Sequence, residues 1–330
     1  MTEIERAAIE QAAAELAPHI VATPLLAAVD RYASEAPAAP ALQLKCEFLQ
    51  RSGSFKFRGA MLHLLRLPEA ARAAGIVAVS AGNHAAACAL AARAAGVSAT
   101  VVMIANANRR RRDLCRAYGA NVVVADSIHE AFATCDRLVR DEGRYLVHPF
   151  DSELTVLGSA TLGREIALAA PTAEAVIVPT GGGGLLAGIG AAVSQWLPSC
   201  QVFGVEPDGA DSMSRSLAAG APVELDRVET VADSLGAPGA RDYSFGLCRR
   251  HAAGVVRVGD AAIRAGMRRL FDDYGLALEP APAAALAALD GPLRERLAGR
   301  RVVALLCGSN IDWATYRSLL DTDAEDADDT

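Results

Sequence analysis

The chain has 330 residues and a formal net charge of −7, with 52% apolar and 22% charged residue types. These proportions are those of a globular protein with one or two domains, and they exclude an intrinsically disordered chain. No apolar run approaches the ~20 residues that span a bilayer, and the acidic start lacks the features of a signal peptide. We therefore predict a soluble chain without a membrane partner.

Cysteine and basic residues narrow the possible chemistry further. Seven cysteines without a Cys-x-x-Cys pair argue against a disulfide framework or a zinc ribbon, so we expect a reduced cytoplasmic setting. Of the 32 basic residues only Lys45 and Lys56 are lysines, which leaves two candidates for any lysine chemistry. The arginine run 109–112 has no aromatic neighbours. We predict a solvated helix face there, and no nucleic-acid partner.

Short β-branched apolar runs alternate along the chain with alanine-rich stretches of helical character. Strands that are apolar throughout are typical of parallel sheets covered on both faces, so the alternation predicts an α/β fold. Turn signals at 147–151 indicate a crossing between two domains, and we expect a loop at 279–282. The predicted strands are 76–79, 100–104, 122–124, 175–178, 202–205, 255–258 and 302–306, and the clearest predicted helices are 84–95, 110–118, 128–141 and 261–274.

The two lysines occur in different local patterns. Lys45 lies in an alternating apolar and polar segment, 42–47, which predicts the outward side of a strand. Lys56 follows a glycine turn and lies between Phe55 and Phe57, in the predicted first turn of a helix. The positive end of a helix is unfavourable for a cation, so Lys56 is either an ordinary surface lysine or an amine with a lowered pKa suited to Schiff-base chemistry.

Four consecutive glycines, Gly181, Gly182, Gly183 and Gly184, connect a predicted strand to a predicted helix. Their backbone N–H groups, together with the positive end of the helix, predict a phosphate site, and a flexible turn is the alternative. The pattern Gly182-x-Gly184-x-x-Ala187, with Glu206 at the end of the next strand, also fits a dinucleotide fingerprint. An NAD(P)-binding oxidoreductase is therefore an alternative from a different functional class.

Two further turns follow predicted strands. Ser80-Ala81-Gly82-Asn83-His84 opens a helix and leaves N–H groups suited to a carboxylate, while the Asn83 amide could bond a ring hydroxyl; a simple helix cap is the alternative. Cys307 ends an apolar strand beside small polar residues. It is either an inert buried thiol or a weak hydrogen-bonding partner for a heteroaromatic nitrogen.

Taken together, these segments resemble the fold-type II pyridoxal-phosphate enzymes, specifically the threonine/serine dehydratase and serine racemase family. The resemblance runs in the same order along nearly the whole chain. The matching pieces are Thr23-Pro24-Leu25, segment 47–60 with Ser54-Phe55-Lys56-Phe57-Arg58-Gly59, Ser80-Ala81-Gly82-Asn83-His84-Ala85, His148-Pro149-Phe150-Asp151, Gly181 to Gly184, Gly204-Val205-Glu206-Pro207, Val231-Ala232-Asp233-Ser234-Leu235 and Cys307-Gly308-Ser309-Asn310.

The resemblance implies a fold and a cofactor. The fold is α/β, with two open, twisted, mostly parallel sheets flanked by helices, as in the β subunit of tryptophan synthase. The smaller domain is inserted in the larger. Residues 1–44 and 151–330 would form the large cofactor-binding domain, and 45–150 a small mobile domain. The implied cofactor is pyridoxal 5′-phosphate, and the implied assembly is a homodimer.

The resemblance also implies a role for each matching position. Lys56 would be the catalytic Schiff-base lysine and general base, Asn83 would bond the cofactor 3′-oxygen, and Cys307 would face the pyridine nitrogen. The phosphate would lie in the glycine loop, and the substrate carboxylate would lie on Ser80, Ala81, Gly82, Asn83 and His84. In the family a divalent cation often binds beside the strand that ends at Glu206. Glu206 and the Ala210 carbonyl are present, but Ser212 replaces an acid, so a metal is doubtful.

One departure from the family pattern bears on the reaction. Racemases of the family carry a second serine where this chain has Ala81, which cannot move a proton. We therefore predict a dehydratase, an L-threonine or L-serine ammonia-lyase that releases a 2-keto acid and ammonia by β-elimination. Hydroxyaspartate or a hydroxyectoine-pathway intermediate are other possible substrates. A serine racemase and a catalytically silent binding protein are the remaining alternatives.

Overall fold

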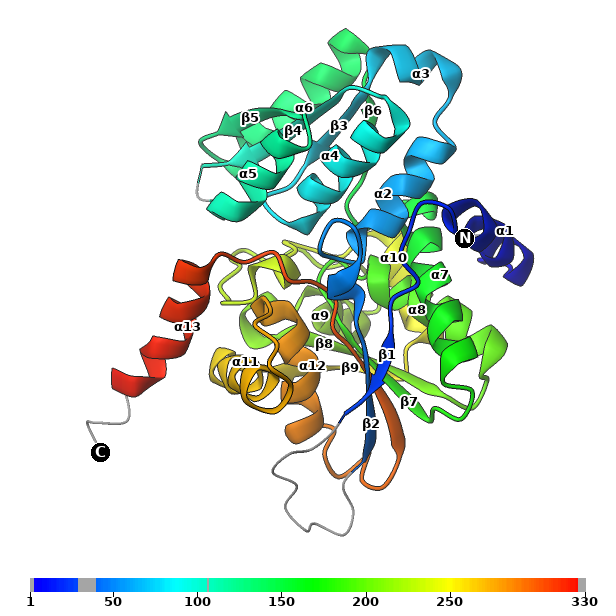
Figure 1. The fold of residues 1–330 in the computed structure, drawn as a ribbon, viewed down its shortest axis with the longest axis vertical. Coiled ribbons are helices and arrows are strands. Elements are labelled where there is room, and N and C mark those ends of the chain that lie inside the picture. The colour runs from blue at the N-terminus through cyan, green and yellow to red at the C-terminus, as the bar shows by residue number, and fades with distance from the viewer. Residues whose placement is uncertain (1–2, 29–39, 106, 326–330) are drawn as a thin grey trace.

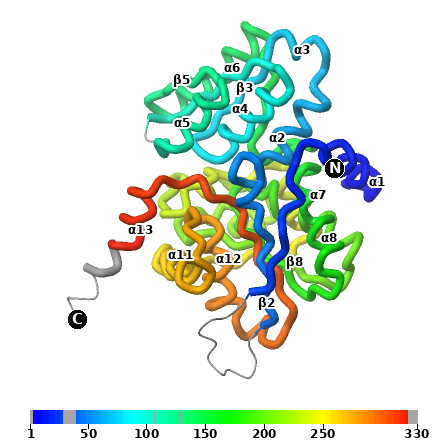
Figure 2. The backbone as a smooth tube through the Cα atoms, viewed as in Figure 1, coloured from blue at the N-terminus to red at the C-terminus, as the bar shows by residue number. Residues whose placement is uncertain are grey.

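The computed structural model describes residues 3–28, 40–105 and 107–325 of the chain. The ribbon forms two lobes, each built around one sheet (Figure 1). We call residues 69–146 the small lobe and the remaining described residues the large lobe. The chain enters the small lobe through one helix and returns along a short connection after residue 146 (Figure 2). The domain limits at 45 and 150 stay a prediction, and the acidic residues 326–330 lie outside the described part of the chain.

The small lobe has a four-stranded parallel sheet in the order β5-β4-β3-β6. Alternate residues of a strand point to opposite faces. Accordingly Ile76 and Ala78 belong to the main core, whereas Val77 and Val79 pack in a separate cluster with residues of α6. Helices therefore cover both faces. The elements are α3 (Glu69–Ala74), β3 (Ile76–Val79), α4 (Asn83–Ala95), β4 (Ala99–Ile104), α5 (Arg109–Ala117), β5 (Asn121–Ala125), α6 (Ile128–Glu142) and β6 (Tyr145–Leu146).

The large lobe has a six-stranded sheet in the order β1-β2-β10-β7-β8-β9, in which only the β1–β2 pair is antiparallel. Helix α8 packs against β7 and β8, and α12 packs against β7 to β10. The strands are β1 (Leu25–Ala27), β2 (Ala41–Lys45), β7 (Ala175–Pro179), β8 (Gln201–Pro207), β9 (Gly254–Val258) and β10 (Arg301–Leu305). The helices are α1 (Arg6–Leu16), η1 (Glu47–Leu49), α2 (Lys56–Leu65), α7 (Glu153–Ala169), α8 (Gly184–Trp196), η2 (Asp208–Ala210), α9 (Ser212–Ala219), η3 (Asp233–Leu235), α10 (Asp242–His251), α11 (Asp260–Tyr274), α12 (Pro280–Asp290) and α13 (Trp313–Glu325).

This architecture confirms the predicted α/β fold with two mostly parallel sheets. The loop expected at 279–282 is wrong, because α12 begins at Pro280. Proline fits the first turn of a helix, where its missing N–H costs nothing. Among the helices of the described residues, none has the length and apolarity needed to cross a bilayer.

Two glycines bring α2 close to α7. A Cβ atom on Gly158 would lie 2.5 Å from the Cα of Gly59, and a Cβ on Gly59 would lie 3.1 Å from the Cα of Thr155. Any larger residue at 158 would push the two helix backbones apart. Because α2 begins with Lys56, this crossing fixes the position of that lysine on the large lobe.

A cluster of four charged side chains lies between β2, α2 and α7. Lys45 Nζ donates to Glu165 Oε2 at 2.8 Å and to the carbonyl oxygen of Thr23 at 2.7 Å. Arg58 donates to Glu165 at 2.7 Å and to both carboxylate oxygens of Glu47 at 2.7 and 2.9 Å. The surface position predicted for Lys45 is therefore wrong, since its side chain is 2% exposed. Glu165 belongs to α7, so this helix covers the Lys45 side chain at the end of β2, which an alternating pattern assigns to solvent.

Candidate active site

A cavity of about 380 Å³ lies between the two lobes. Its walls include the segments that follow β3, β7 and β10, because the carboxyl ends of these parallel strands point toward it. Crevices at this edge of open α/β sheets are the usual ligand sites. The sequence-predicted residues that line it are Lys56, Ser80, Ala81, Gly82, Asn83, His84, Gly181, Gly182, Gly183, Gly184 and Cys307.

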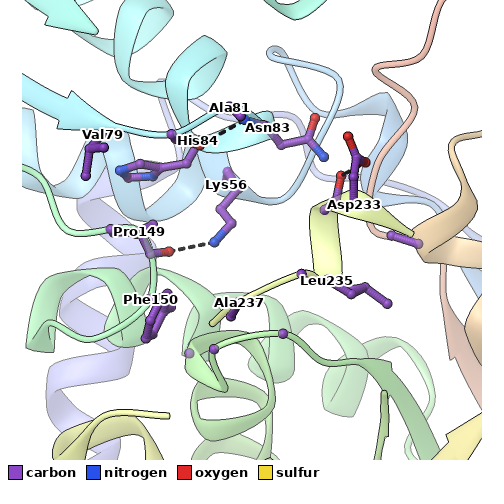
Figure 3. A pocket seen from close by; sticks show the side chains of 18 of the residues that line it. Lys56, Val79, Ala81, Asn83, His84, Pro149, Phe150, Asp233, Leu235 and Ala237 are labelled. Atoms are coloured by element: carbon purple, nitrogen blue, oxygen red, sulfur yellow. Dashed lines mark hydrogen bonds between the residues drawn. The ribbon is translucent and has the colours of Figure 1, made fainter. Parts of the chain in front are cut away.

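Lys56 is the first residue of α2, and its side chain points into this cleft (Figure 3). Its Nζ donates to the carbonyl oxygen of Pro149 at 2.6 Å. The surrounding protein withdraws water from the amine and lowers the pKa of Lys56 to about 8. A lysine with this pKa is partly unprotonated near neutral pH. It can therefore act as a nucleophile or as a general base.

The glycine loop presents its backbone to the cleft. The carbonyl oxygens of Gly182 and Gly183 accept hydrogen bonds from Ser244 and Cys248 of α10, at 3.0 and 3.4 Å. Within the described residues, the N–H groups of Gly182 and Gly183 donate no hydrogen bond to another backbone group. They lie at the N-terminal, positive end of α8. These free donors make the loop a candidate anion site.

Phe150 explains why this loop is glycine. A Cβ atom on Gly182 would lie 2.4 Å from the Phe150 ring, and one on Gly184 would lie 2.3 Å from the Phe150 carbonyl oxygen. Gly183 has φ +89°, a conformation that side chains disfavour. The loop is thus pressed against the segment whose Pro149 oxygen holds Lys56.

The turn between β3 and α4 forms the opposite wall. The N–H of Gly82 donates to Ser80 Oγ at 3.0 Å, and α4 begins at Asn83. His84 donates from Nε2 to the Val147 carbonyl oxygen at 2.8 Å, and burial lowers the pKa of His84 well below its usual value. His84 is therefore a neutral imidazole held in one orientation. The first turn of α4 offers N–H groups to an anion.

Asn83 is held by residues of the large lobe. Its Nδ2 donates to Glu279 Oε1 at 2.5 Å, and its Oδ1 accepts from Asn310 Nδ2 at 2.8 Å. Cys307 is 3% exposed, and burial raises the pKa of its thiol well above the ordinary value. Cys307 is consequently a neutral group on the cleft wall.

Sequence reasoning missed three charged residues of the cleft: Arg111, Asp233 and Glu279. Arg111 belongs to the run expected to form a solvated face, and that expectation is wrong for it, since its side chain is 3% exposed. Arg109 of the same run is 85% exposed. The acid before Pro280 could have been recognised as a helix start. No local signal distinguishes Arg111 from its neighbours.

Glu206 and Ala210 do not line the cleft. Both oxygens of Glu206 accept backbone N–H groups of α9, from Met213 and Ser214 at 2.8 Å each. The carboxylate therefore anchors the start of α9 and is not free for a ribose, as the dinucleotide interpretation requires. Among the described residues, no group of three or more His, Cys, Asp or Glu side chains could hold a metal ion.

A cleft between two open α/β sheets, with a lysine and a glycine loop on its walls, defines the fold-type II class of pyridoxal-phosphate enzymes. The chain belongs to the family described as "Pyridoxal-phosphate dependent enzyme", whose model matches residues 16–308. The cofactor of this family is pyridoxal 5′-phosphate. The cleft fits it, because the glycine loop has free N–H donors for a phosphate and Lys56 has an amine with a lowered pKa.

Individual relatives have related activities. The chain is 52% identical to a phenylserine dehydratase of Ralstonia pickettii, over 84% of this chain and 85% of that protein. It is 37% identical to an L-threo-3-hydroxyaspartate ammonia-lyase of a Pseudomonas species, over 84% and 87%. The structure of maize serine racemase matches with a TM-score of 0.90 at 30% identity, covering 99% of both chains.

Proposed function

We propose that this chain is an ammonia-lyase that converts a β-hydroxy-α-amino acid to a 2-keto acid and ammonia. The observation that carries the proposal is the asymmetry of the cleft. Lys56 is an amine poised to move a proton on one side, and the residue at the second-base position on the other side is Ala81. The overall reaction moves the β-hydroxyl out as water, and water later replaces the amine, so atoms balance without an oxidant.

Each group that lines the cleft has its own role in the proposed reaction. Lys56 takes the proton from the substrate Cα when its amine is unprotonated. The N–H groups at the starts of α8 and α4 would hold the cofactor phosphate and the substrate carboxylate, respectively. Asn83 would donate to the 3′-oxygen of the cofactor, and the Cys307 thiol would be the neutral partner of its ring nitrogen. Bound pyridoxal phosphate supplies the electron sink for the bond that breaks at Cα.

Elimination is favoured over racemisation by the groups opposite Lys56. A racemase must deliver a proton to the second face of Cα, which needs a proton-carrying side chain there. Ala81 has none. His84 is neutral and already donates its Nε2 proton to Val147. L-Serine racemisation should therefore be a minor activity.

The charges of the cleft disfavour an acidic substrate. Among the cleft-lining residues of the described chain, Lys56 and Arg111 carry the cationic groups, and Arg111 is already paired with Asp233 and Glu279. A second substrate carboxylate would lack a partner there and would face two acids. Hydroxyaspartate is thus a poor fit.

An apolar β-substituent fits the same cleft better. Its small-lobe wall includes apolar side chains from β3, β4, α6 and the segment after β4. The similarity to a phenylserine dehydratase supports an aromatic substituent, while L-threonine and L-serine remain smaller candidates. The apolar wall residues are Val79, Val102, Ile104, Ala107, Ala131 and Phe132.

A keto-acid assay over four substrates tests this proposal. Purified protein with pyridoxal phosphate should be yellow, and borohydride should fix the cofactor on Lys56. We expect the highest kcat/KM with phenylserine, lower values with L-threonine and L-serine, and the lowest with hydroxyaspartate. A coloured protein that releases no keto acid from any of them would be a silent binder and would refute the proposal.

Compartment and assembly stay predictions. All seven cysteines are free thiols, which supports a reduced, cytoplasmic setting. A homodimer can be checked by measuring the mass in solution. Unchanged activity after dialysis against a chelator would support an enzyme without a divalent cation.

A further inference from the structure

Arg111 links the two lobes across the cleft. It belongs to α5 of the small lobe, and all its partners belong to the large lobe. Its guanidinium donates to both oxygens of Asp233 at 2.5 and 3.0 Å, and to Glu279 Oε2 at 3.0 Å. It also donates to Ser234 Oγ and to the Asn310 carbonyl oxygen, each at 3.0 Å.

The two acids that Arg111 contacts have different surroundings. Asp233 is 55% exposed, so water stabilises its charge. Glu279 is completely buried and depends on protein groups. Burial raises the pKa of Glu279, Asp233 adds to this effect, and Arg111 and Asn83 oppose it. Of the described residues, the titratable or charged groups that face Glu279 are Arg111 from α5, Asp233 from η3 and Cys307 after β10.

Glu279 in turn determines how the Asn83 amide is oriented. An ionised carboxylate is an acceptor only, so the Asn83 NH₂ group must face Glu279. On the other side Asn310 Nδ2 donates to Asn83 Oδ1, and the same Nδ2 also donates to the Ser52 carbonyl oxygen, each at 2.8 Å. Both contacts agree on one orientation of the amide. A protonated Glu279 would carry a donor and would remove half of this constraint.

The room for this arrangement comes from Gly308. A Cβ atom at this position would lie 2.2 Å from Glu279 Oε1 and 2.9 Å from Asn83 Nδ2. Any side chain there would displace the carboxylate from the amide. The residue next to Cys307 thus leaves space for the Glu279–Asn83 hydrogen bond.

We propose that Arg111 is a positioning residue that stabilises the Glu279 carboxylate by an ion pair, so that Glu279 holds the Asn83 amide with its N–H toward the 3′-oxygen of the cofactor. This inference rests on the proposed function, because it needs pyridoxal phosphate in the cleft. The hydrogen bonds of Arg111 between the two lobes would then contribute to cofactor binding. Without the cation, the buried carboxylate would be less stable and its protonation would be favoured further.

The first test compares Arg111→Met with Arg109→Met, a change of the same kind on the exposed side of the same helix. The dissociation constant of pyridoxal phosphate is measured by its visible absorbance on cofactor-free protein, at pH 6.5 and 9.5. We expect Arg111→Met to bind about tenfold more weakly than wild type at pH 6.5, and the loss to shrink to about threefold or less at pH 9.5, because a higher pH favours the ionised carboxylate. Arg109→Met should match wild type at both values. An equal ratio at both pH values would contradict the inference.

A second comparison separates this role from a merely structural one. In a Glu279→Gln background the side chain is neutral at all pH values and still accepts from Asn83. Adding Arg111→Met to Glu279→Gln should then change the dissociation constant by less than about threefold. A further loss of about tenfold would mean that Arg111 only holds the lobes together, and would overturn the proposal. The comparison of Glu279→Gln with the double variant still tests the proposal if Arg111→Met alone fails to fold.

Failure of the proposed function would look different. Wild-type protein that binds no pyridoxal phosphate would refute the function itself. Wild-type protein that binds it, with variants that show neither the pH-dependent loss nor its suppression by Glu279→Gln, would refute only the role of Arg111.

Discussion

The two lysines of the chain have opposite surroundings, although both lie inside the protein. Lys45 is 2% exposed, and Glu165 in the four-residue cluster beneath α2 balances its charge. Lys56 opens onto the cleft, and its Nζ donates to the neutral Pro149 carbonyl oxygen. Burial among neutral groups lowers the pKa of an amine, and such an amine can act as a base. The absence of a counter-charge thus indicates which lysine is reactive.

Among the tests of this contrast, replacement of Lys56 should have the largest effect on activity. Lys56→Ala should lower kcat for keto-acid release by at least ~10³-fold, because the chain loses both its general base and the amine that binds the cofactor. The thermal unfolding midpoint of the cofactor-free protein should not fall. Activity that survives in Lys56→Ala would mean that another residue carries the chemistry.

Breaking the cluster of Lys45, Glu47, Arg58 and Glu165 should instead lower the stability of the protein. Glu47→Ala leaves Arg58, which is completely buried, with Glu165 as its remaining acid, and should cost about 3–5 kcal/mol of stability. Urea unfolding measures this change. Asp141→Ala, which removes an exposed partner of Arg140, is the control and should leave the unfolding midpoint unchanged. A midpoint equally unchanged by Glu47→Ala would show that the cluster contributes nothing.

A smaller loss of stability is expected when Lys45 is replaced by arginine, which keeps the positive charge but is larger. Lys45→Arg places a larger group against Thr23 and Glu165, and should cost about 1–3 kcal/mol by overpacking. The kcat for keto-acid release should be unchanged, since no contact runs from Lys45 to the cleft-lining residues in the described structure. A loss of kcat with normal stability would connect the cluster to catalysis.

The sequence was sufficient for the parts of the fold that depend on local pattern. The apolar runs coincide with β3, β4, β5, β7, β8, β9 and β10. Among these, β3 and β7 are buried at every position, as strands covered on both faces are expected to be. The alternating pattern of β2 misplaced Lys45, because the last two residues of the strand, Leu44 and Lys45, are both buried. Alternation therefore indicates an exposed face only where no helix packs on it.

Among the cleft residues, too, those in local sequence motifs could be predicted, and those that only the fold brings together could not. Lys56, Asn83, the glycine loop and Cys307 all occur in local motifs and all line the cleft, while their roles stay predictions. Arg111 could not be found in this way. Its partners Asp233 and Glu279 lie 122 and 168 residues further along the chain, and four arginines in a row look alike until the fold selects one.

The reactivity of the two amines can be compared in a single sample of cofactor-free protein. Only an unprotonated amine is acetylated, and a pKa near 8 leaves Lys56 about one tenth unprotonated at pH 7 and mostly unprotonated above pH 9. The rate of acetylation at Lys56, followed by mass spectrometry, should therefore rise about tenfold from pH 6 to pH 7 and become constant above pH 9. Lys45 should react slowly throughout, because Glu165 and Thr23 occupy its hydrogen-bonding positions. A Lys56 rate that keeps rising tenfold per unit beyond pH 9 would return its pKa to the ordinary range, and the contrast between the two lysines would then be one of access alone.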